Sequence, residues 1–326
     1  MPVNIIMYHY VRNNEDNDYD TYCRRKSEFE SQVKFFKNSS TIIHPADSDK
    51  FHYFLKSEDK NAFLLTFDDG YIDHLYCARY LNSENLSAYF FPPINSINGE
   101  FLDVNAIHIL IGKRGLEVKT ILEEIEKICL SHNFYLILNK KELNFQNYIE
   151  EFNLKNNHDD KNTLMLRRIL QKDLIGEKNK KYTIKKLLKK FINKTANELT
   201  KDFYLSLSNL KEMKNMGMYF GSHGNTHRWL NTLNPSEQKI EIELSFESLK
   251  RFKLISEQEP KVLCYPFGAF DMNTLNIMNQ LNIDIGLSSK LGSSILTNEK
   301  DSILKLSRWD TNSCWSNKWR KPCMPI

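Results

Sequence analysis

The apolar run in 61-NAFLLTF-67 is the feature that most restricts how this chain can fold. A strand that is apolar on both faces is covered on both faces, which is typical of parallel sheets, whereas a half-exposed strand alternates apolar and polar residues. Residues 73–85 then have helical spacing, and residues 86–93 again resemble a strand. This strand-helix-strand order predicts an α/β fold for the first part of the chain.

The same alternation resumes near residue 200, after a segment of different composition. Residues 207–217 have helical spacing, 218–223 resemble a strand, and further helix-like and strand-like stretches follow. Between the two α/β parts, residues 104–199 are rich in Lys and Asn, and their apolar residues recur with helical periodicity. We therefore predict a mainly parallel sheet or barrel made of residues 1–103 and 200–326, interrupted by a helical insertion over 104–199.

Acidic residues and histidines follow the predicted strands, at the end where parallel strands gather their ligands. Asp68 and Asp69 are neighbours, and the repulsion between their charges is costly unless a cation or hydrogen-bond donors lie nearby. The H-x-x-x-H spacing of His223 and His227 lets both imidazoles face one point, which suits chelation of a divalent metal. Asp69 would complete a set of two histidines and one carboxylate with open positions. Surface or capping histidines, and a helix N-cap for the aspartates, are the structural alternatives.

The sequence resembles the polysaccharide deacetylases of carbohydrate esterase family 4, the NodB-homology group, in three motifs. These are T-F-D-D-G at 66–70, S-H-G-N-T-H at 222–227 and Y-P-F-G at 265–268. The opening M-Y-H-Y-V is also similar to the start of many members, and the resemblance covers roughly residues 1–103 and 200–311. It implies a distorted (β/α) barrel of the NodB type, usually with fewer than eight strands, with the helical insertion outside the common core.

The resemblance also implies an activity and its residues. Asp68 would be the catalytic base. Asp69, His223 and His227 would hold a divalent metal, with Zn²⁺ expected first and Co²⁺, Ni²⁺ or Mn²⁺ as alternatives. The metal would polarise an acetamide carbonyl and a water whose proton Asp68 accepts, which releases acetate and a free amine. The segment assigned to the substrate and to the oxyanion, through a backbone N–H near Phe267, is Tyr265, Pro266, Phe267 and Gly268.

Two departures from the family pattern concern the residues that support catalysis. Cys264 stands where many members have an arginine that orients the base. Arg308 is the candidate to supply the guanidinium from a later strand, with a surface ion pair as the alternative. The family's late histidine, which protonates the leaving amine, has no counterpart because no histidine follows His227. His9, after the first predicted strand, is a candidate for an active-site role, against burial in the end of the barrel.

Composition limits the location and the partners. A formal charge of +4 over 326 residues gives no case for nucleic-acid binding. The start of the sequence does not resemble a secretory signal, and no run of about 18 apolar residues is present, so we predict a cytoplasmic protein without a membrane span. The six cysteines form no C-x-x-C pair, which favours reduced thiols, with a Cys314–Cys323 bridge as the alternative.

Lysines gather beside and along one amphipathic helix. They are Lys178, Lys180, Lys181, Lys185, Lys186, Lys189, Lys190 and Lys194. Such a run is usually a solvated face, and the alternative is contact with an anionic membrane surface or with the phosphates of an activated sugar. The substrate hypothesis is therefore an N-acetylated sugar carried on a nucleotide or lipid diphosphate, or another surface-glycan precursor, with peripheral membrane contact as a further hypothesis.

Three functions compete at this point. The leading hypothesis is a metal-dependent carbohydrate N-deacetylase. A glycoside hydrolase that uses Asp68 with another carboxylate would leave the histidine pair unused, so sensitivity to a chelator separates it from the first. A carbohydrate-binding barrel without turnover is the non-catalytic reading, and release of acetate from N-acetylated sugars separates it from a deacetylase.

Overall fold

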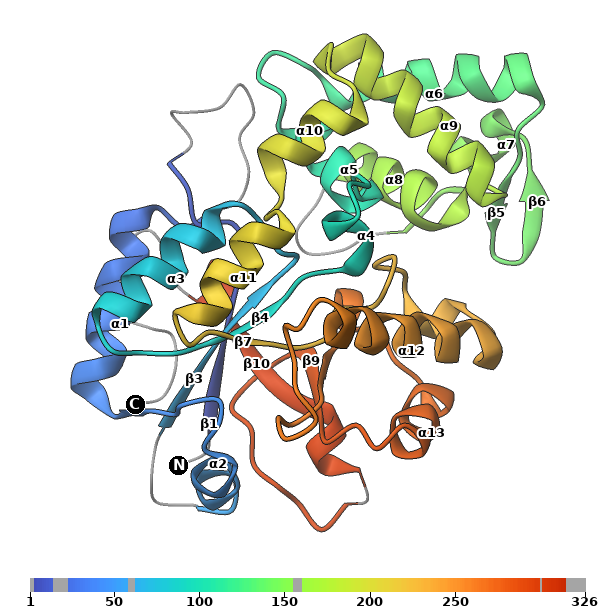
Figure 1. Ribbon diagram of the computed structural model, residues 1–326. Helices are drawn as coiled ribbons and strands as arrows, with labels where there is room; N and C mark the ends of the chain where they lie inside the picture. The colour runs from blue at the N-terminus through green and yellow to red at the C-terminus, as the bar shows by residue number, and fades with distance from the viewer. Residues whose placement is uncertain (1–2, 14–22, 58–61, 155–159, 300, 315–326) are drawn as a thin grey trace. The chain divides into compact units, whose positions relative to one another are not determined.

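The computed structural model of the chain describes residues 3–13, 23–57, 62–154, 160–299 and 301–314 (Figure 1). The chain divides into two compact units. Unit 1 comprises Met1–Asn13, Tyr22–Gly99 and Lys201–Ile326, and unit 2 comprises Asn14–Thr21 and Glu100–Thr200. The domain boundaries expected from the sequence, after residues 103 and 199, remain a prediction. Cys323 lies outside the described residues, and with it the Cys314–Cys323 alternative.

Parallel strands form the centre of unit 1 (Figure 1). They are β1 (Val3–Tyr8), β2 (Thr41–Ile42), β3 (Ala62–Asp68), β4 (Tyr89–Phe91), β7 (Tyr219–Phe220), β8 (Val262–Cys264), β9 (Ile285–Leu291) and β10 (Leu306–Asp310). They pair in the order β7-β4-β3-β1-β10-β9-β8, with β2 beside β3, and each of these pairings is parallel.

A backbone bridge after β7 joins the two ends of this series. The Ser222 N–H donates to the Val262 carbonyl at 2.9 Å, and the Cys264 N–H donates to the Ser222 carbonyl at 2.8 Å. Within the described residues the result is a nearly closed parallel barrel of seven strands. The predicted distorted (β/α) barrel is confirmed.

Helices connect and cover the strands of unit 1. They are α1 (Lys26–Ser39), α2 (Ser48–Leu55), α3 (Asp73–Ser83), α4 (Ile94–Ile97), α11 (Leu207–Asn215), α12 (Pro235–Arg251), α13 (Met272–Gln280) and α14 (Thr311–Cys314), with short 3₁₀ turns η4 (Leu230–Thr232), η5 (Pro266–Gly268) and η6 (Ser302–Lys305). The order of strands and helices along the chain explains why the strands are parallel, because each crossover returns the chain to the same end of the barrel.

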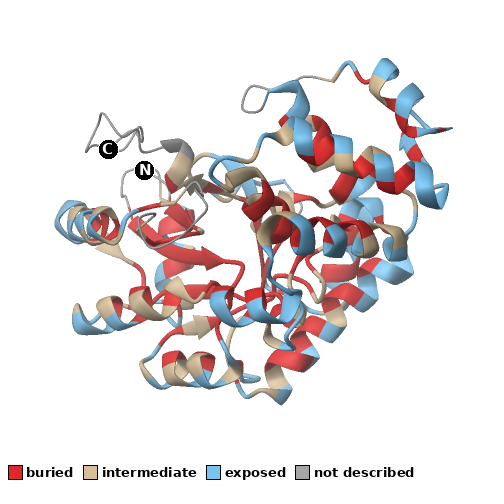
Figure 2. Cartoon of the chain, turned by 90° about the horizontal axis from the view of Figure 1, so that it is seen from above, coloured by how far each residue is buried: buried red, intermediate tan, exposed pale blue. Residues whose placement is uncertain are grey.

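Alternate residues of β3 enter two apolar layers, which accounts for its unbroken apolar sequence. Phe63, Leu65 and Phe67 pack with residues of α1 and α3. Leu64 belongs to a second cluster, inside the barrel, together with residues of β1, β4, β8, β9 and β10. The strands are accordingly coloured as buried throughout much of their length in Figure 2.

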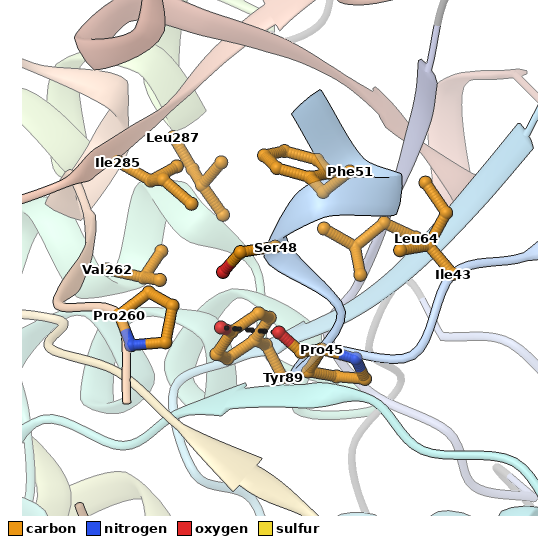
Figure 3. Close-up of a pocket in the computed structure, with 10 residues that line it drawn as sticks. All are labelled: Ile43, Pro45, Ser48, Phe51, Leu64, Tyr89, Pro260, Val262, Ile285 and Leu287. Atoms are coloured by element: carbon orange, nitrogen blue, oxygen red, sulfur yellow. Dashed lines mark hydrogen bonds between the residues drawn. The ribbon is translucent and has the colours of Figure 1, made fainter. Parts of the chain in front are cut away.

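The amino-terminal end of the barrel is packed shut. Phe51 of α2 lines a cavity of about 10 Å³ there, together with Leu64, Val262 and Leu287 (Figure 3). A space of this size holds one water molecule at most. This cavity therefore has no room for a larger ligand, and the polar residues that follow the strands lie at the other end of the barrel.

Unit 2 is mostly helical, as expected for residues 104–199. Its elements are α5 (Asp103–Gly112), α6 (Val118–His132), β5 (Leu136–Leu138), β6 (Lys141–Leu143), α7 (Phe145–Glu151), α8 (Lys161–Arg168), η2 (Ile169–Asp173), α9 (Glu177–Leu187) and η3 (Leu188–Ile192), and α10 (Ala196–Phe203) contains the boundary with unit 1. The antiparallel pair β5-β6 was not expected from the sequence. Among the described helices, none combines the length and the apolar content needed to cross a membrane.

Residues 183–199, whose apolar side chains recur with helical periodicity, do not form one continuous helix. The helix ends at Asn193, which adopts φ 57°, and α10 begins three residues later. Thr195 and Glu198 form a reciprocal cap, because the Glu198 carboxylate accepts from the Thr195 N–H at 2.7 Å and the Glu198 N–H donates to the Thr195 hydroxyl at 3.3 Å. A T-x-x-E capping box after an Asn is thus the local signal that starts a new helix.

Candidate active site

The ends of two strands bring the acidic pair and the histidine pair together. Strand β3 ends at Asp68, and the chain then turns through left-handed backbone at Asp69 (φ 73°) and Gly70 (φ 67°). His223 and His227 follow β7. The Asp69 Oδ1 atom lies 3.3 Å from His223 Nε2 and 3.1 Å from His227 Nε2. Residues more than 150 positions apart in the sequence therefore form one buried cluster.

The three side chains fit a divalent metal. The second carboxylate oxygen of Asp69 accepts from the Tyr71 hydroxyl at 2.6 Å, whereas Oδ1 is buried and has no hydrogen-bond donor among the described residues. His223 Nδ1 lies 2.8 Å from the Cys264 carbonyl, which only accepts, so Nδ1 carries the proton and Nε2 presents its lone pair. One carboxylate oxygen and two imidazole nitrogens within 4.8 Å of one another are ligand types that Zn²⁺ and related ions prefer.

The protonation states of Asp69 and His227 suit the same role. Burial acts to raise the pKa of Asp69, but the neighbouring imidazoles of His223 and His227 outweigh it and hold that pKa well below its usual value. Burial lowers the pKa of His227, which favours the neutral imidazole. A carboxylate and a neutral imidazole are the forms that bind a metal. Burial acts to lower the pKa of His223, but Cys264 and the two aspartates raise it well above its usual value, so a metal would bind there in place of a proton.

Arg308 binds Asp68. The sequence alone allowed either this pairing or a surface ion pair for Arg308. The Arg308 guanidinium donates from Nη1 to Asp68 Oδ1 at 2.9 Å and from Nη2 to Oδ2 at 2.7 Å, and both side chains are buried. Burial acts to raise the pKa of Asp68, but the charge and hydrogen bonds of Arg308 outweigh it and lower the pKa to about 2. Asp68 is therefore an ionised carboxylate beside the cluster at neutral pH.

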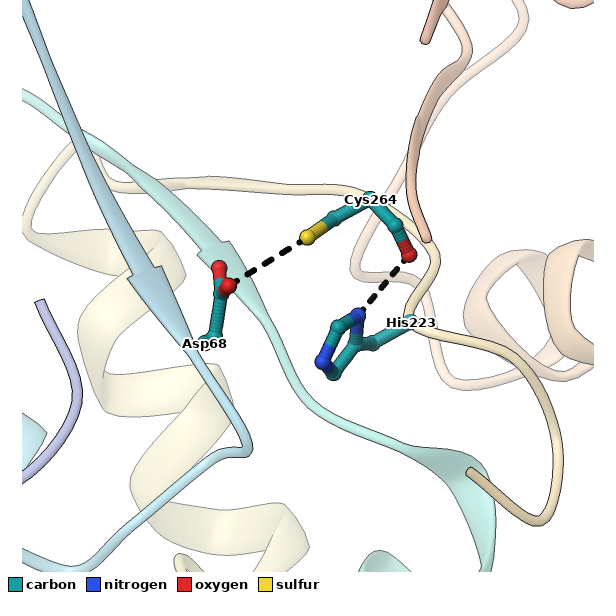
Figure 4. A group of neighbouring side chains, drawn as sticks. All are labelled: Asp68, His223 and Cys264. Atoms are coloured by element: carbon teal, nitrogen blue, oxygen red, sulfur yellow. Dashed lines mark hydrogen bonds between the residues drawn. The ribbon is translucent and has the colours of Figure 1, made fainter. Parts of the chain in front are cut away.

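Cys264 contacts both parts of the site (Figure 4). Its Sγ lies 3.4 Å from Asp68 Oδ2, and its carbonyl is the partner of His223. Burial raises the pKa of the Cys264 thiol, so the group is a protonated donor to the carboxylate. Sequence reasoning named Cys264 only as a missing arginine, because a cysteine at a strand end carries no signal of this contact.

Glu241 is a site residue that sequence reasoning missed. From the buried face of α12 it accepts the backbone N–H groups of Asn225 at 2.8 Å and Thr226 at 2.9 Å, and also the Thr226 hydroxyl. These bonds hold the turn that presents His227, whose φ of 59° is left-handed. The signal in the sequence was a polar stripe on an amphipathic helix, where Glu241 shares the buried face with Gln238 and Ser245.

The residues of the segment after β8 lie in two different places. The Tyr265 side chain is in the core, where its hydroxyl donates to the Leu304 carbonyl at 2.6 Å. Phe267 adopts φ 58°, packs its ring 4.6 Å from that of His227, and has a backbone N–H without a protein acceptor among the described residues. Gly268 has φ 66°, and a Cβ there would lie 2.7 Å from Ser289 Cβ. The Phe267 N–H is thus a free donor beside the cluster, while the predicted roles of the segment stay predictions.

His9 lies at the edge of the site. Its Nε2 is 4.0 Å from Asp68 Oδ2, and 29% of its side chain is exposed. The His9 carbonyl accepts from His74 Nε2 at 2.8 Å, which fixes the backbone at this point. His9 is thus within reach of both solvent and the base, and its active-site role stays a prediction.

Known proteins resemble this chain both in sequence and in fold. A family model described as polysaccharide deacetylase matches residues 130–286. The resemblance to polysaccharide deacetylases is confirmed. The matched range includes the His223 and His227 motif and the 265–268 segment, and the acidic pair precedes it. A search of curated proteins finds no match.

Solved structures of deacetylases share the fold. The Streptococcus pyogenes deacetylase PplD, solved in complex with acetate, is 17% identical with a TM-score of 0.54, over 95% of this chain and 92% of that one. A polysaccharide deacetylase from Bacillus cereus is 16% identical with a TM-score of 0.53, over 95% and 65%. IcaB from Ammonifex degensii is 12% identical with a TM-score of 0.51, over 93% and 94%. At these identities the likeness bears on the fold alone.

Proposed function

We propose that the chain is a metal-dependent hydrolase that removes N-acetyl groups from an amino sugar or a surface-glycan precursor. The observation that carries the proposal is the convergence of Asp69, His223 and His227 beside an ionised Asp68. The match to the polysaccharide deacetylase family supports the reaction class.

Different residues of the chain transfer protons and bind the oxygen on which charge develops. Asp68 accepts a proton from the attacking water, and the two hydrogen bonds from Arg308 fix the orientation of its carboxylate. The free N–H of Phe267 donates to the oxygen on which negative charge develops, a contribution worth about 3 to 4 kcal/mol in other hydrolases. His9, 4.0 Å from Asp68, delivers a proton to the departing amine.

Asp69, His223 and His227 would hold the divalent ion, with Zn²⁺ proposed first. When bound, the ion supplies Lewis-acid polarisation of the amide and lowers the pKa of water. Tyr71 and the Cys264 carbonyl orient two of the three ligands through their other polar atoms, as expected of partners that fix a ligand's tautomer and direction.

The substrate and its location are part of the proposal. A cytoplasmic enzyme would act on N-acetylated sugars before export, such as sugars linked to a nucleotide or lipid diphosphate. Cell fractionation and assays on free, nucleotide-linked and polymeric N-acetylated sugars would separate these substrate classes.

The test is release of acetate from N-acetylated oligosaccharides by the metal-loaded chain. Asp68→Asn should keep the metal and lose activity by about 10²-fold or more, because the general base is gone. Asp49→Asn, at an exposed aspartate of α2, is the matched control and should keep full activity. Normal turnover by Asp68→Asn would refute the assigned base. Turnover that is unaffected by a chelator would favour a glycosidase or another metal-free enzyme, and absence of acetate release by the metal-loaded chain would favour a binding protein.

A further inference from the structure

Unit 2 carries a groove that the proposed reaction does not use. It has a volume of about 510 Å³ and lies between α6 and the segment formed by α9 and η3. This volume is in the range of small-molecule sites. The groove lies entirely within unit 2, so its composition can be considered without the barrel.

Positive charge is concentrated in this groove. Its lysines are Lys127, Lys186, Lys189 and Lys190, and its one acidic residue is Glu124. Glu124 is already paired with Lys190 at 2.6 Å. The other three lysines are exposed and have no carboxylate partner among the described residues. Like charges in a concave surface repel one another and focus a positive potential, which an anionic ligand would relieve.

The lysine-rich sequence alone did not define this site. Lys180 pairs with Glu177 at 2.5 Å, and Lys181 pairs with Glu100 at 3.5 Å, so part of the run is an ordinary charged surface. The groove instead combines lysines of the run with Lys127, which comes from α6. In the folded chain the groove therefore contains only part of the lysine run, together with one lysine from another helix.

One wall of the groove is held by hydrogen bonds. His132 Nδ1 lies 3.1 Å from the Ile128 carbonyl and 2.7 Å from the Ser131 hydroxyl, and His132 Nε2 lies within hydrogen-bond distance of the Tyr182 hydroxyl, at 3.0 Å. The Lys186 ammonium lies 5.3 Å from the centre of the Tyr182 ring, over its face. The wall that supports Lys186 is thus ordered by its own contacts before any ligand arrives.

We propose that this groove binds a diphosphate group. Lysine ammonium groups are compact donors suited to phosphate oxygens, and three unpaired lysines match the charge of a diphosphate better than that of a single carboxylate. The chemistry is shared by a soluble nucleoside diphosphate and by the diphosphate headgroup of a lipid. The inference concerns unit 2 and does not depend on the deacetylase reaction.

Calorimetric titration of sodium pyrophosphate into the full chain tests the proposal. The double variant Lys186→Glu/Lys189→Glu should weaken binding by roughly tenfold or more, equivalent to about 1.4 kcal/mol or more. The control Lys178→Glu/Lys185→Glu changes the net charge equally, on exposed positions of α9 outside the groove lining, and should bind like the parent chain. All four substitutions are on the surface, so circular dichroism should show both proteins folded.

Vesicles distinguish the two sources of phosphate. Saturable binding of free pyrophosphate that is lost in the groove variant supports a soluble ligand. Binding only to phosphatidylcholine vesicles that contain a polyprenyl diphosphate, lost in the groove variant and kept in the control, supports a lipid headgroup. Equal weakening by both double variants, or binding of neither probe by the parent chain, overturns the proposal. Binding of a single-stranded oligonucleotide that depends on the groove lysines while pyrophosphate neither binds nor competes also overturns it.

Discussion

Replacing Arg308 by methionine should destabilise the chain strongly and in a pH-dependent way. The change removes both donors of the Asp68 carboxylate, at 2.9 and 2.7 Å, and leaves that carboxylate buried. Removing one partner of a buried ion pair typically costs about 3 to 5 kcal/mol. Arg79→Met is the control, because Arg79 pairs with Glu212 at the surface, and such pairs are worth about 0 to 1 kcal/mol.

The pKa of Asp68 sets the pH range of the effect. In the parent chain this pKa is about 2 in the folded state, below the ordinary value of 3.8. A lowered pKa of this size corresponds to about 2 to 3 kcal/mol of stability, present above the unfolded pKa and lost as pH falls toward 2. Without Arg308, burial dominates and the folded pKa rises above its ordinary value. The difference in unfolding free energy between parent and variant should therefore be largest at neutral pH and shrink in acid.

Urea unfolding followed by circular dichroism, at neutral pH and again near the ordinary pKa of Asp68, measures this difference. Asp68→Asn combined with Arg308→Met should be less destabilised than Arg308→Met alone, because no charge is left buried without a partner. In acetate-release assays, Arg308→Met should move the acidic limb of the pH profile upward. A loss of stability equal to that of Arg79→Met, or one that does not change with pH, would refute the reasoning.

Three further changes test other contacts. Tyr71→Phe removes the 2.6 Å hydrogen bond to Asp69, so Zn²⁺ affinity should fall about 10- to 100-fold in a chelator-competition titration, whereas Tyr80→Phe, which removes a hydroxyl without a partner, should leave it unchanged. Gly268→Ala should lower the melting temperature and acetate release together, because a Cβ would lie 2.8 Å from the Ser289 nitrogen and the backbone is left-handed; an unchanged melting temperature would contradict this. Burial raises the pKa of Asp103 to about 6, a stabilising effect present below about pH 4 and lost as pH rises through 6. Asp103→Asn should therefore raise the unfolding free energy at pH 7 by up to about 3 kcal/mol, and equal stability of the two proteins at pH 7 would count against a buried carboxylate.

The location of the site could be predicted from the sequence because the ends of the strands could be predicted from it. The apolar run before Asp68 and the strand before His223 mark two parallel strands, and parallel strands end on one rim of a barrel. Asp69, His223 and His227 could therefore be expected to meet. Their distances, and the orientation of each ring, depend on the backbone turns at positive φ that no residue pattern specified.

Contacts between side chains of distant elements could not be predicted from the sequence. Arg308 was a candidate for pairing with Asp68, yet a surface ion pair was equally consistent with the sequence. The two residues are 240 positions apart, so their contact depends on the tertiary fold. Tyr265 belongs to the same motif as Phe267, but its phenol is in the core because the 3₁₀ turn that follows, with Phe267 at φ 58°, changes the direction of the chain between the two residues. Glu241 resembled any other acidic residue of a helix until the turn that it holds was in place.

Anomalous diffraction at the zinc absorption edge, from crystals of the full chain grown with Zn²⁺, is the most direct measurement of the proposed metal centre. The expected result is one strong peak bonded to Asp69 Oδ1, His223 Nε2 and His227 Nε2, with Asp68 beside it and still paired with Arg308. A fully occupied peak elsewhere, with none among these three side chains, would contradict the proposed metal-dependent deacetylase.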